Sequence, residues 1–345
     1  MPSSPINRPG IRRAGFAVLA IALLSTLAAC GASAGSSPTV GTSGSDTPVT
    51  IGLTYVPNIQ FAPFYVAQDL GYYKAEGLNV TLHHHAAAED EFGALVAGQE
   101  NMIFASGDEI LGARSHGVPI VDVASVYRQS PITLIVPADS PIHTLADLRG
   151  HSIGVPGLYG ATYIGLLGLL KSAGLTQQDV TIKAIGYTQK PALMSHQVDA
   201  VMGYLNNEPI VFQQADFPIR TFPVSGVLPL VSNGLAALEP ELQQHPDVVK
   251  KVVAATLKGV QYVIAHPQQA LKISEKYVPG LSTPSNAATG MAVLNATLPL
   301  WKTSGQWGYN NPQDWQQMTT LMQSQGLLPK SVTATQAYSN AYLPG

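Results

Sequence analysis

Residues 49–71 read VTIGLTYVPNIQFAPFYVAQDLG and contain a complete strand-to-helix unit. The β-rich run Val49–Tyr55 predicts a strand, and Ala62–Leu70 predicts a helix that a glycine ends. A turn containing Pro57-Asn58 lies between them. Short apolar strands and helices continue to alternate as far as Val224. This alternation predicts βαβ units, and therefore α/β architecture with mainly parallel sheets that helices cover.

Two segments are plausible crossovers between sheets, namely residues 137–141 (PADSP) and 224–226 (VSG). We therefore predict two α/β lobes. The first consists of residues 49–137 and 225–345, and the second of residues 138–224. Ligands of open α/β sheets bind beyond the carboxyl ends of the strands, so we expect a ligand cleft between the lobes.

Composition excludes several classes of protein. The chain has 345 residues, which favours about two domains. Its formal net charge is -3, and Lys plus Arg number only 18, which excludes a basic nucleic-acid-binding protein. Its single cysteine excludes a disulfide scaffold and a cysteine-based zinc site. The chain has no internal run of 18 apolar residues, which excludes a polytopic membrane protein.

The N-terminal residues resemble a targeting segment. Three arginines precede the apolar run Ala14–Ala29, which is too short to span a bilayer as a helix. The run leads into LAACG, which resembles a bacterial lipobox and contains the only cysteine, Cys30. We predict a lipoprotein signal peptide at residues 1–29, lipid on Cys30 and a flexible linker at residues 30–48. The alternative is an ordinary signal peptide with an incidental cysteine. Either version places the mature protein outside the cytoplasmic membrane.

Several predicted strands lead directly into polar and aromatic residues. Residues 55–61 follow the first strand, and their rings and amide either face a ligand or serve as core anchors and a turn. Residues 106–109 (SGDE) either form a capping box or contact a ligand. Residues 203–209 (GYLNNEP) place two amides and a carboxylate at a strand end, where burial without a partner is costly. There we favour ligand contact over a solvated turn that caps the next helix.

A glycine-rich stretch, residues 154–162 (GVPGLYGAT), joins a strand to a long apolar helix. Its free amides could hold polar ligand atoms, but the stretch lacks the nucleotide-binding glycine motifs. The predicted ligand-binding residues are Tyr55, Asn58, Phe61, Ser106, Asp108, Tyr127, Gly157, Tyr159, Thr162, Tyr204, Asn207 and Glu208.

Three consecutive histidines, His83, His84 and His85, end another predicted strand. They cannot all face one point, because alternate side chains leave a strand on opposite faces. His83 and His85 could bind a metal together with Glu89 or Asp90, but we favour a solvated strand end and assign no metal site. The sequence lacks H-E-x-x-H and G-x-S-x-G motifs, so no catalytic residues are predicted.

These segments together resemble one known family. They are similar to the solute-binding proteins of ABC importers in the thiamine-pyrimidine-precursor superfamily, to which sulfonate and taurine binders also belong. The resemblance covers about Val49–Ala265, and its motifs are highly specific for the superfamily. The matching segments are Pro57-Asn58 with residues 61–67, then residues 70–78, 106–109, 113–114, 137–140, 145–150 and 198–201.

Two segments bear on the ligand. Residues 159–165 (YGATYIG) and 203–209 look more like the riboflavin-binding branch, whereas Pro57-Asn58 is shared with the thiamine-pyrimidine branch. That branch often carries tryptophan before the Pro-Asn pair, where this chain has Tyr55-Val56. The chain also lacks the cysteine-rich motif of the fungal pyrimidine synthases, which use iron and a self-donated histidine.

The resemblance implies a two-lobed α/β fold of the periplasmic-binding-protein type II class. It implies a lipid-anchored extracytoplasmic solute-binding protein, not an enzyme, without a cofactor. Its ligand is then a thiamine pyrimidine precursor or riboflavin, and its partners are an ABC permease with its ATPase subunits. Three alternatives stay open: a sulfonate or taurine binder with Arg128 as the nearby cation, a metal-binding receptor, and an iron-dependent enzyme of the pyrimidine-synthase type.

Overall fold

The computed structural model describes residues 46–86, 89, 90, 92–228 and 230–345. These residues belong to one compact unit, Ser45–Gly345. The predicted signal peptide, Cys30 and nearly all of the predicted linker lie outside the described residues. The linker prediction extends two residues too far, since Thr47 and Pro48 already pair with the second strand.

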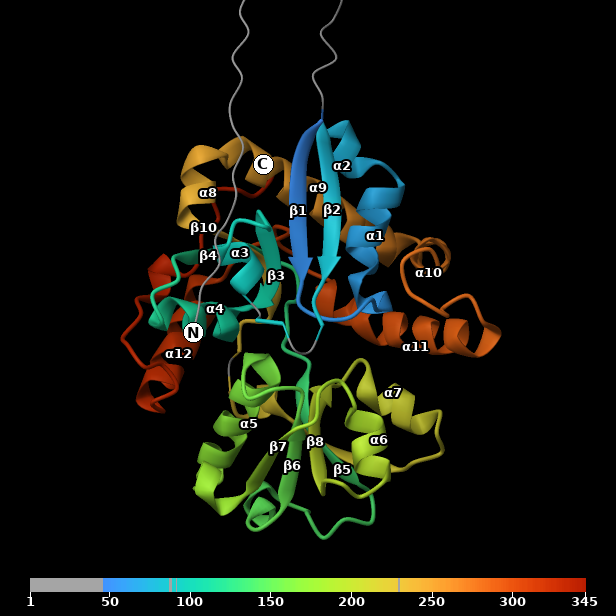
Figure 1. Ribbon diagram of the computed structural model, residues 1–345, viewed down its shortest axis with the longest axis vertical. Helices are drawn as coiled ribbons and strands as arrows, with labels where there is room; N and C mark the ends of the chain where they lie inside the picture. The colour runs from blue at the N-terminus through green and yellow to red at the C-terminus, as the bar shows by residue number, and fades with distance from the viewer. Residues whose placement is uncertain (1–45, 87–88, 91, 229) are drawn as a thin grey trace, which may run out of the picture. The chain divides into compact units, whose positions relative to one another are not determined.

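Five strands form the first sheet, in the order β2-β1-β3-β10-β4 (Figure 1). β1 runs parallel to β2 and β3, whereas β10 is antiparallel to both β3 and β4. All residues of β3 and β4 are buried, as their nearly continuous apolar sequences require. The strands are β1 (Thr47–Leu53), β2 (Leu78–His84), β3 (Met102–Ser106), β4 (Ile120–Ser125) and β10 (Asn233–Leu238).

The second sheet also has five strands, in the order β7-β6-β8-β5-β9. β6 runs parallel to β7 and β8, and β5 is antiparallel to β8 and β9. Each sheet is thus mixed and contains one strand antiparallel to both of its neighbours, which strict βαβ alternation does not predict. The strands are β5 (Ile132–Pro137), β6 (Ser152–Val155), β7 (Thr181–Ala184), β8 (Ala200–Tyr204) and β9 (Ile219–Pro223).

The first crossover comes earlier than the sequence suggested. We predicted it at residues 137–141, which would leave β5 in the first lobe. Instead β5 pairs with β8 and β9 of the second sheet, so the chain changes sheets between β4 and β5. β5 is an apolar strand that both sheets could accommodate, so its sequence does not specify its partners. We call the part containing β5–β9 the second lobe and the remainder the first lobe.

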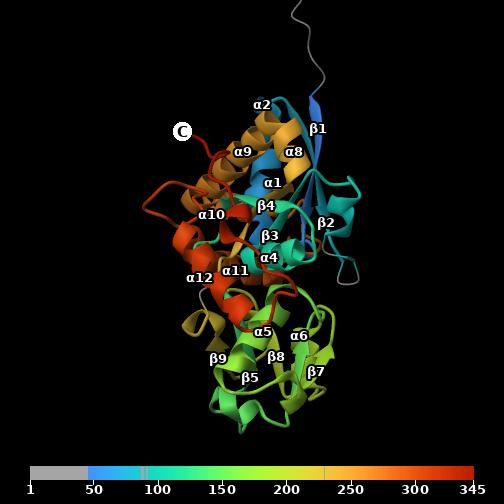
Figure 2. The same ribbon diagram turned by 90° about the vertical axis from the view of Figure 1, so that its left-hand side faces the viewer.

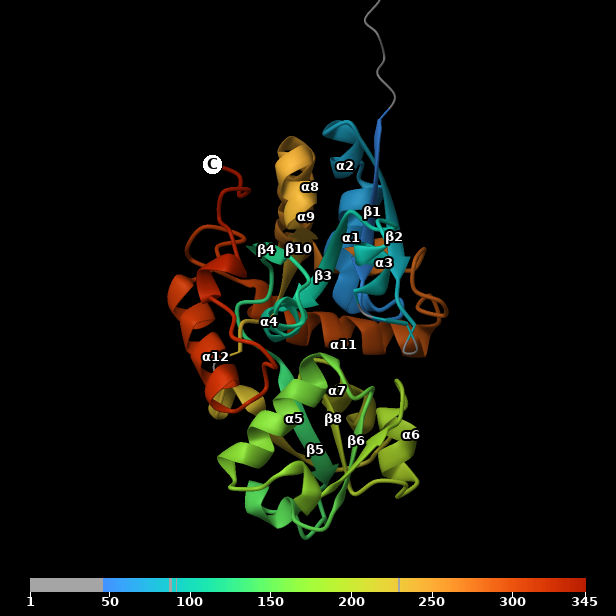
Figure 3. The ribbon, with the colours of Figure 1, turned by 60° about the vertical axis from the view of Figure 1, so that its left-hand side comes forward.

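Helices cover both faces of each sheet (Figures 2 and 3). In the first lobe, α1 and α9 bury one face, and α4 and α12 bury the other. In the second lobe, α5 covers one face while α6 and α7 cover the other. The helices are α1 (Ala62–Asp69), α2 (Tyr72–Ala75), α3 (Gly93–Val96), α4 (Gly107–Ser115), α5 (Gly160–Ser172), α6 (Gln189–Met194), α7 (Glu208–Gln213), α8 (Glu239–Gln244), α9 (Pro246–Ala265), α10 (Pro267–Ser274), α11 (Pro284–Trp301) and α12 (Pro312–Ser324).

A buried polar network ties the C-terminal segment to β4. The Asn310 side chain donates from Nδ2 to Asp122 Oδ1 over 2.7 Å, and Trp315 Nε1 donates to Asn310 Oδ1 over 2.8 Å. The Asp122 backbone accepts from the Ser339 amide and donates to the Ala337 carbonyl. Asp122 is fully buried, and this burial raises the pKa of its carboxyl to about 7.

None of the helices in the described part of the chain is both long enough and apolar enough to cross a membrane.

Candidate functional site

A pocket forms where the strand ends of the two lobes face each other. Seven of its lining side chains are aromatic and two are glutamates. None of the described residues that line it is a lysine, arginine or histidine. The lining residues are Thr54, Tyr55, Gln60, Phe61, Phe104, Glu109, Tyr127, Pro156, Tyr159, Gly160, Ala161, Thr162, Tyr187, Gln189, Tyr204, Asn207, Glu208 and Asn233.

The aromatic rings come from both lobes. Tyr55 follows β1 and Tyr187 follows β7, and their rings pack edge to face with centroids 4.3 Å apart. Phe104 lies within 6.3 Å of both Phe61 and Tyr127, measured between ring centroids. Burial and the nearby Glu208 and Tyr187 raise the pKa of the Tyr55 hydroxyl. The Tyr55 hydroxyl therefore stays protonated at neutral pH, and it adds a hydrogen-bond donor to the aromatic lining of the pocket.

Glu109 connects the lobes. One carboxylate oxygen, Oε2, accepts from the Ser106 amide over 2.8 Å, which ties it to the start of α4. The other oxygen, Oε1, accepts from the Ala161 amide over 2.7 Å, at the start of α5 in the second lobe. One buried carboxylate thus serves two helix N-termini, where exposed amide donors and the helix dipole favour negative charge.

Glu208 is the second carboxylate of the pocket. It is 7% exposed, and its Oε2 accepts from the Tyr204 amide over 2.7 Å. Its Oε1 accepts from Asn207 Nδ2 over 3.2 Å. The absence of a side chain at Gly203 leaves room for it, because a Cβ there would lie 2.8 Å from Glu208 Cγ. Burial raises the pKa of the Glu208 carboxyl despite these hydrogen bonds.

The adjacent amides, Asn206 and Asn207, have different environments. The buried side chain of Asn206 does not line the pocket and donates to Thr297 Oγ1 on α11 over 2.7 Å. Asn207 lines the pocket. Asn206 therefore joins the second lobe to α11, whereas Asn207 is part of the pocket wall.

Eight of the twelve predicted ligand-binding residues line this pocket. They are Tyr55, Phe61, Tyr127, Tyr159, Thr162, Tyr204, Asn207 and Glu208.

The other four predicted residues do not line it. The Asn58 side chain accepts from the Gln60 amide over 3.0 Å and caps a short helical turn. Ser106 and Asp108 are buried at the start of α4. Burial, followed by the charge of Glu109, raises the pKa of Asp108 to about 7. Gly157 is covered by the ring of Tyr159.

Several lining residues escaped sequence reasoning. Tyr187 and Gln189 follow β7, so the strand-end argument used elsewhere would have found them. Asn233 had no such signal, because it begins β10 rather than following a strand. It reaches the pocket because antiparallel pairing places it opposite Ser106, the last residue of β3.

The comparisons with known proteins agree with this architecture. The family model described as NMT1/THI5 like matches residues 58–270. The riboflavin-binding protein RibY of Chloroflexus aurantiacus is 32% identical over 341 residues, covering 95% of this chain and 97% of RibY. The formylaminopyrimidine-binding protein of Halalkalibacterium halodurans is 25% identical, covering 85% of this chain and 89% of that protein.

Enzymes occur among the relatives as well. The 4-amino-5-hydroxymethyl-2-methylpyrimidine phosphate synthase of Legionella pneumophila is 23% identical, covering 86% of this chain and 92% of the synthase.

A solved structure supports the fold. The alkanesulfonate-binding protein SsuA of Xanthomonas axonopodis pv. citri matches with a TM-score of 0.69 at 18% identity, covering 86% of this chain and 99% of SsuA. The predicted two-lobed periplasmic-binding-protein fold is thereby confirmed. Since the family model covers well over half of the chain, this protein belongs to the NMT1/THI5-like family.

Proposed function

We propose that this chain is the solute-binding component of an ABC importer and that it captures a vitamin-type aromatic heterocycle, with riboflavin as the favoured ligand. The observation that carries the proposal is the composition of the pocket, where rings from both lobes surround two carboxylates without a lysine or arginine among the described lining residues. Flat rings stack well on tyrosine and phenylalanine. Riboflavin is neutral, and its imide N–H and ribityl hydroxyls are donors suited to carboxylate oxygens.

The relatives support the same ligand class. The greatest identity quoted above, 32%, belongs to a protein named for riboflavin, and the next, 25%, belongs to one named for a formylaminopyrimidine. The pyrimidine remains the second candidate, because a smaller ring would also stack on the aromatic side chains that line the pocket. The larger ligand is favoured because aromatic side chains reach the pocket from β1, β3, β7 and β8, a spread that suits an extended ring system.

A sulfonate fits this pocket poorly. An anion requires donors, and the Ala161 amide at the start of α5 already donates to Glu109. A sulfonate would also meet the negative charge of Glu109, and a like charge in a buried site is costly. The nearby cation considered from the sequence, Arg128, instead donates to the Tyr309 carbonyl over 2.6 Å and does not line the pocket.

Ligand titration tests the proposal. Riboflavin should raise the melting temperature of the full chain without added metal or nucleotide, and its flavin fluorescence should be quenched by the stacked tyrosines. At 100 times the dissociation constant, the folded state gains about 2.7 kcal/mol. A thiamine pyrimidine, thiamine, taurine and an alkanesulfonate form the comparison panel. Stabilisation by sulfonates alone would refute the heterocycle assignment. Iron in the purified protein would favour an enzyme of the pyrimidine-synthase type.

We further propose that the protein is held at the outer face of the cytoplasmic membrane by lipid on Cys30. The lipobox-like sequence supports this proposal. Cys30→Ser should shift the protein from the membrane fraction to the soluble fraction, since stable anchoring needs more than one acyl chain and the substitution removes the attachment point. Fractionation of cells producing either form measures this. A Cys30→Ser protein that stays with the membranes would rule out lipid on Cys30 as the anchor.

A further inference from the structure

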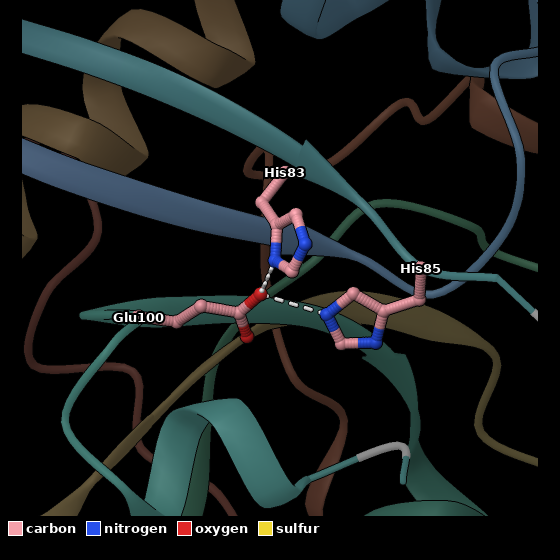
Figure 4. Close-up of side chains that lie close together, drawn as sticks. All are labelled: His83, His85 and Glu100. Carbon is pink, nitrogen blue, oxygen red and sulfur yellow. Dashed lines mark hydrogen bonds and ion pairs between the residues drawn. The ribbon is translucent and has the colours of Figure 1, made fainter. Parts of the chain in front are cut away.

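Two histidines and a glutamate meet outside the pocket, in the first lobe. His83 Nδ1 and His85 Nε2 each lie 2.7 Å from the same oxygen of Glu100, Oε1 (Figure 4). The sequence hypothesis paired these histidines with Glu89 or Asp90. The structure shows a different partner, because Glu89 accepts from the Ala86 amide and Asp90 accepts from the Phe92 amide.

Strand register explains how the three side chains meet. His83 and His85 are two positions apart along the edge strand β2 and its end, so they leave on the same face. Glu100 precedes β3, which is separated from β2 by β1. Its carboxylate therefore has to cross over β1. It does so at Gly52, which is paired with His83, because a Cβ there would lie 2.3 Å from Glu100 Oε2.

The intervening histidine takes no part. His84 leaves on the opposite face, where its Nδ1 contacts the Tyr55 carbonyl over 2.9 Å and its Nε2 contacts the Tyr65 hydroxyl over 3.0 Å. The expectation that three consecutive histidines cannot converge is thereby confirmed, while two of them do converge with Glu100.

The cluster is buried and incompletely satisfied. The side chain of Glu100 is 0% exposed and that of His85 is 4% exposed, whereas His83 is 43% exposed. Within the described residues, Glu100 Oε2 has no hydrogen-bond partner. Burying a carboxylate without satisfying its oxygens is expensive. A cation at the cluster would offset that cost.

We propose that His83, His85 and Glu100 bind one divalent transition-metal ion of the zinc type. Two imidazole nitrogens and a carboxylate oxygen are donors that Zn²⁺ accepts, and the three ligand atoms already lie within 4.8 Å of one another. Mg²⁺ and Ca²⁺ prefer all-oxygen sites. His83 remains partly exposed, so solvent can supply the fourth ligand and the ion can enter from that side. None of the three residues lines the pocket, so this site does not depend on the proposed solute.

Metal titration of the untagged full chain tests the proposal. Buffered Zn²⁺ should bind one ion per chain and raise the melting temperature, whereas Mg²⁺ at the same concentration should leave it unchanged. His83→Ala and Glu100→Gln should each weaken Zn²⁺ binding by more than about 100-fold. Substituting a residue that only hydrogen-bonds to a metal ligand already lowers metal affinity by about 10- to 100-fold. His116→Ala removes an exposed histidine outside the cluster and is the matched control.

Co²⁺ substitution gives a second, independent readout. The wild-type chain should show the intense visible absorption of a low-coordinate Co²⁺ ion, and His83→Ala should lose it. His83 is the most exposed of the three, so this variant retains the fold even if Glu100→Gln does not. Equal Zn²⁺ affinity in the wild-type chain and His83→Ala would overturn the proposal, as would a loss in His116→Ala that matches the loss in His83→Ala.

Discussion

Glu109→Gln should lower the affinity for the solute by about 10- to 100-fold. In the wild-type chain, each carboxylate oxygen of Glu109 accepts one backbone amide, and the two amides belong to different lobes. Glutamine retains one acceptor oxygen and turns an NH₂ group toward the other amide. A hydrogen bond to a charged group contributes roughly 1.5–3 kcal/mol, and a buried amide without an acceptor adds a penalty. The lost bond holds the lobes closed, so the loss appears mainly in ligand affinity.

Isothermal titration with the ligand identified by the screen measures this effect, alongside melting of the ligand-free protein. Glu76→Gln removes an exposed glutamate far from the pocket and should change neither quantity. Unchanged affinity in Glu109→Gln would mean that this carboxylate only caps α4. A fall in stability without a fall in affinity would lead to the same conclusion.

Asp122→Asn should make the protein more stable at pH 8 than the wild type, by on the order of 2–4 kcal/mol, and should remove part of the pH dependence of its stability. Burial raises the pKa of Asp122 to about 7 from a reference value of 3.8. Between those values the folded state binds more protons than the unfolded state. The free energy of unfolding therefore falls as the pH rises through this interval, by up to about 1.4 kcal/mol per pH unit. Asparagine is neutral over this whole pH range, so the variant does not lose unfolding free energy in this way.

Urea unfolding between pH 5 and pH 8 measures the difference. It can be followed by tryptophan fluorescence, to which Trp315 contributes with its indole hydrogen-bonded to Asn310. Asp108 has a raised pKa for the same reason, so the variant should keep a residual slope of the same sign. Asp139→Asn, at an exposed position, should reproduce the wild-type profile. An identical slope in Asp122→Asn and the wild type would contradict the assignment.

Sequence reasoning located the pocket because strand ends are visible in a sequence. Tyr55, Tyr204 and Glu208 each follow an apolar run, and parallel strands bring such ends to one edge of a sheet. Asn233 could not be found in this way, because it is the first residue of its strand and reaches the pocket only through the antiparallel pairing of β10 with β3. The sheet that contains β5 was also undetermined, since an apolar strand is compatible with either lobe.

The histidine cluster shows a different limit. The sequence suggested that His83 and His85 share a face, but their partner had to be chosen from acids close in the sequence. Glu100 reaches them only because β1 lies between β2 and β3 with a glycine at the crossing point. Which acidic residue meets the two histidines therefore depends on the order and register of the strands, and the periodicity of a single strand does not encode either.

The order of strands also has a consequence for how the chain folds. β10 lies between β3 and β4, yet it is synthesised after the whole of the second lobe. The first sheet therefore remains divided until Asn233–Leu238 is available. The second lobe is continuous in sequence and can form earlier. The pairing of β5 with β9 then brings the two ends of the second lobe together, because Thr133 at the start of β5 pairs with Pro223 at the end of β9.

Once that pairing exists, the two chain segments that lead back to the first lobe emerge side by side. The loop that β10 has to close shrinks from the whole second lobe to two short connections, which reduces the entropic cost of closure. Long-range pairing of this kind is usually slow. In this chain, early folding of the second lobe would act as a template that delivers β10 to its position and sets the rate at which the first sheet is completed.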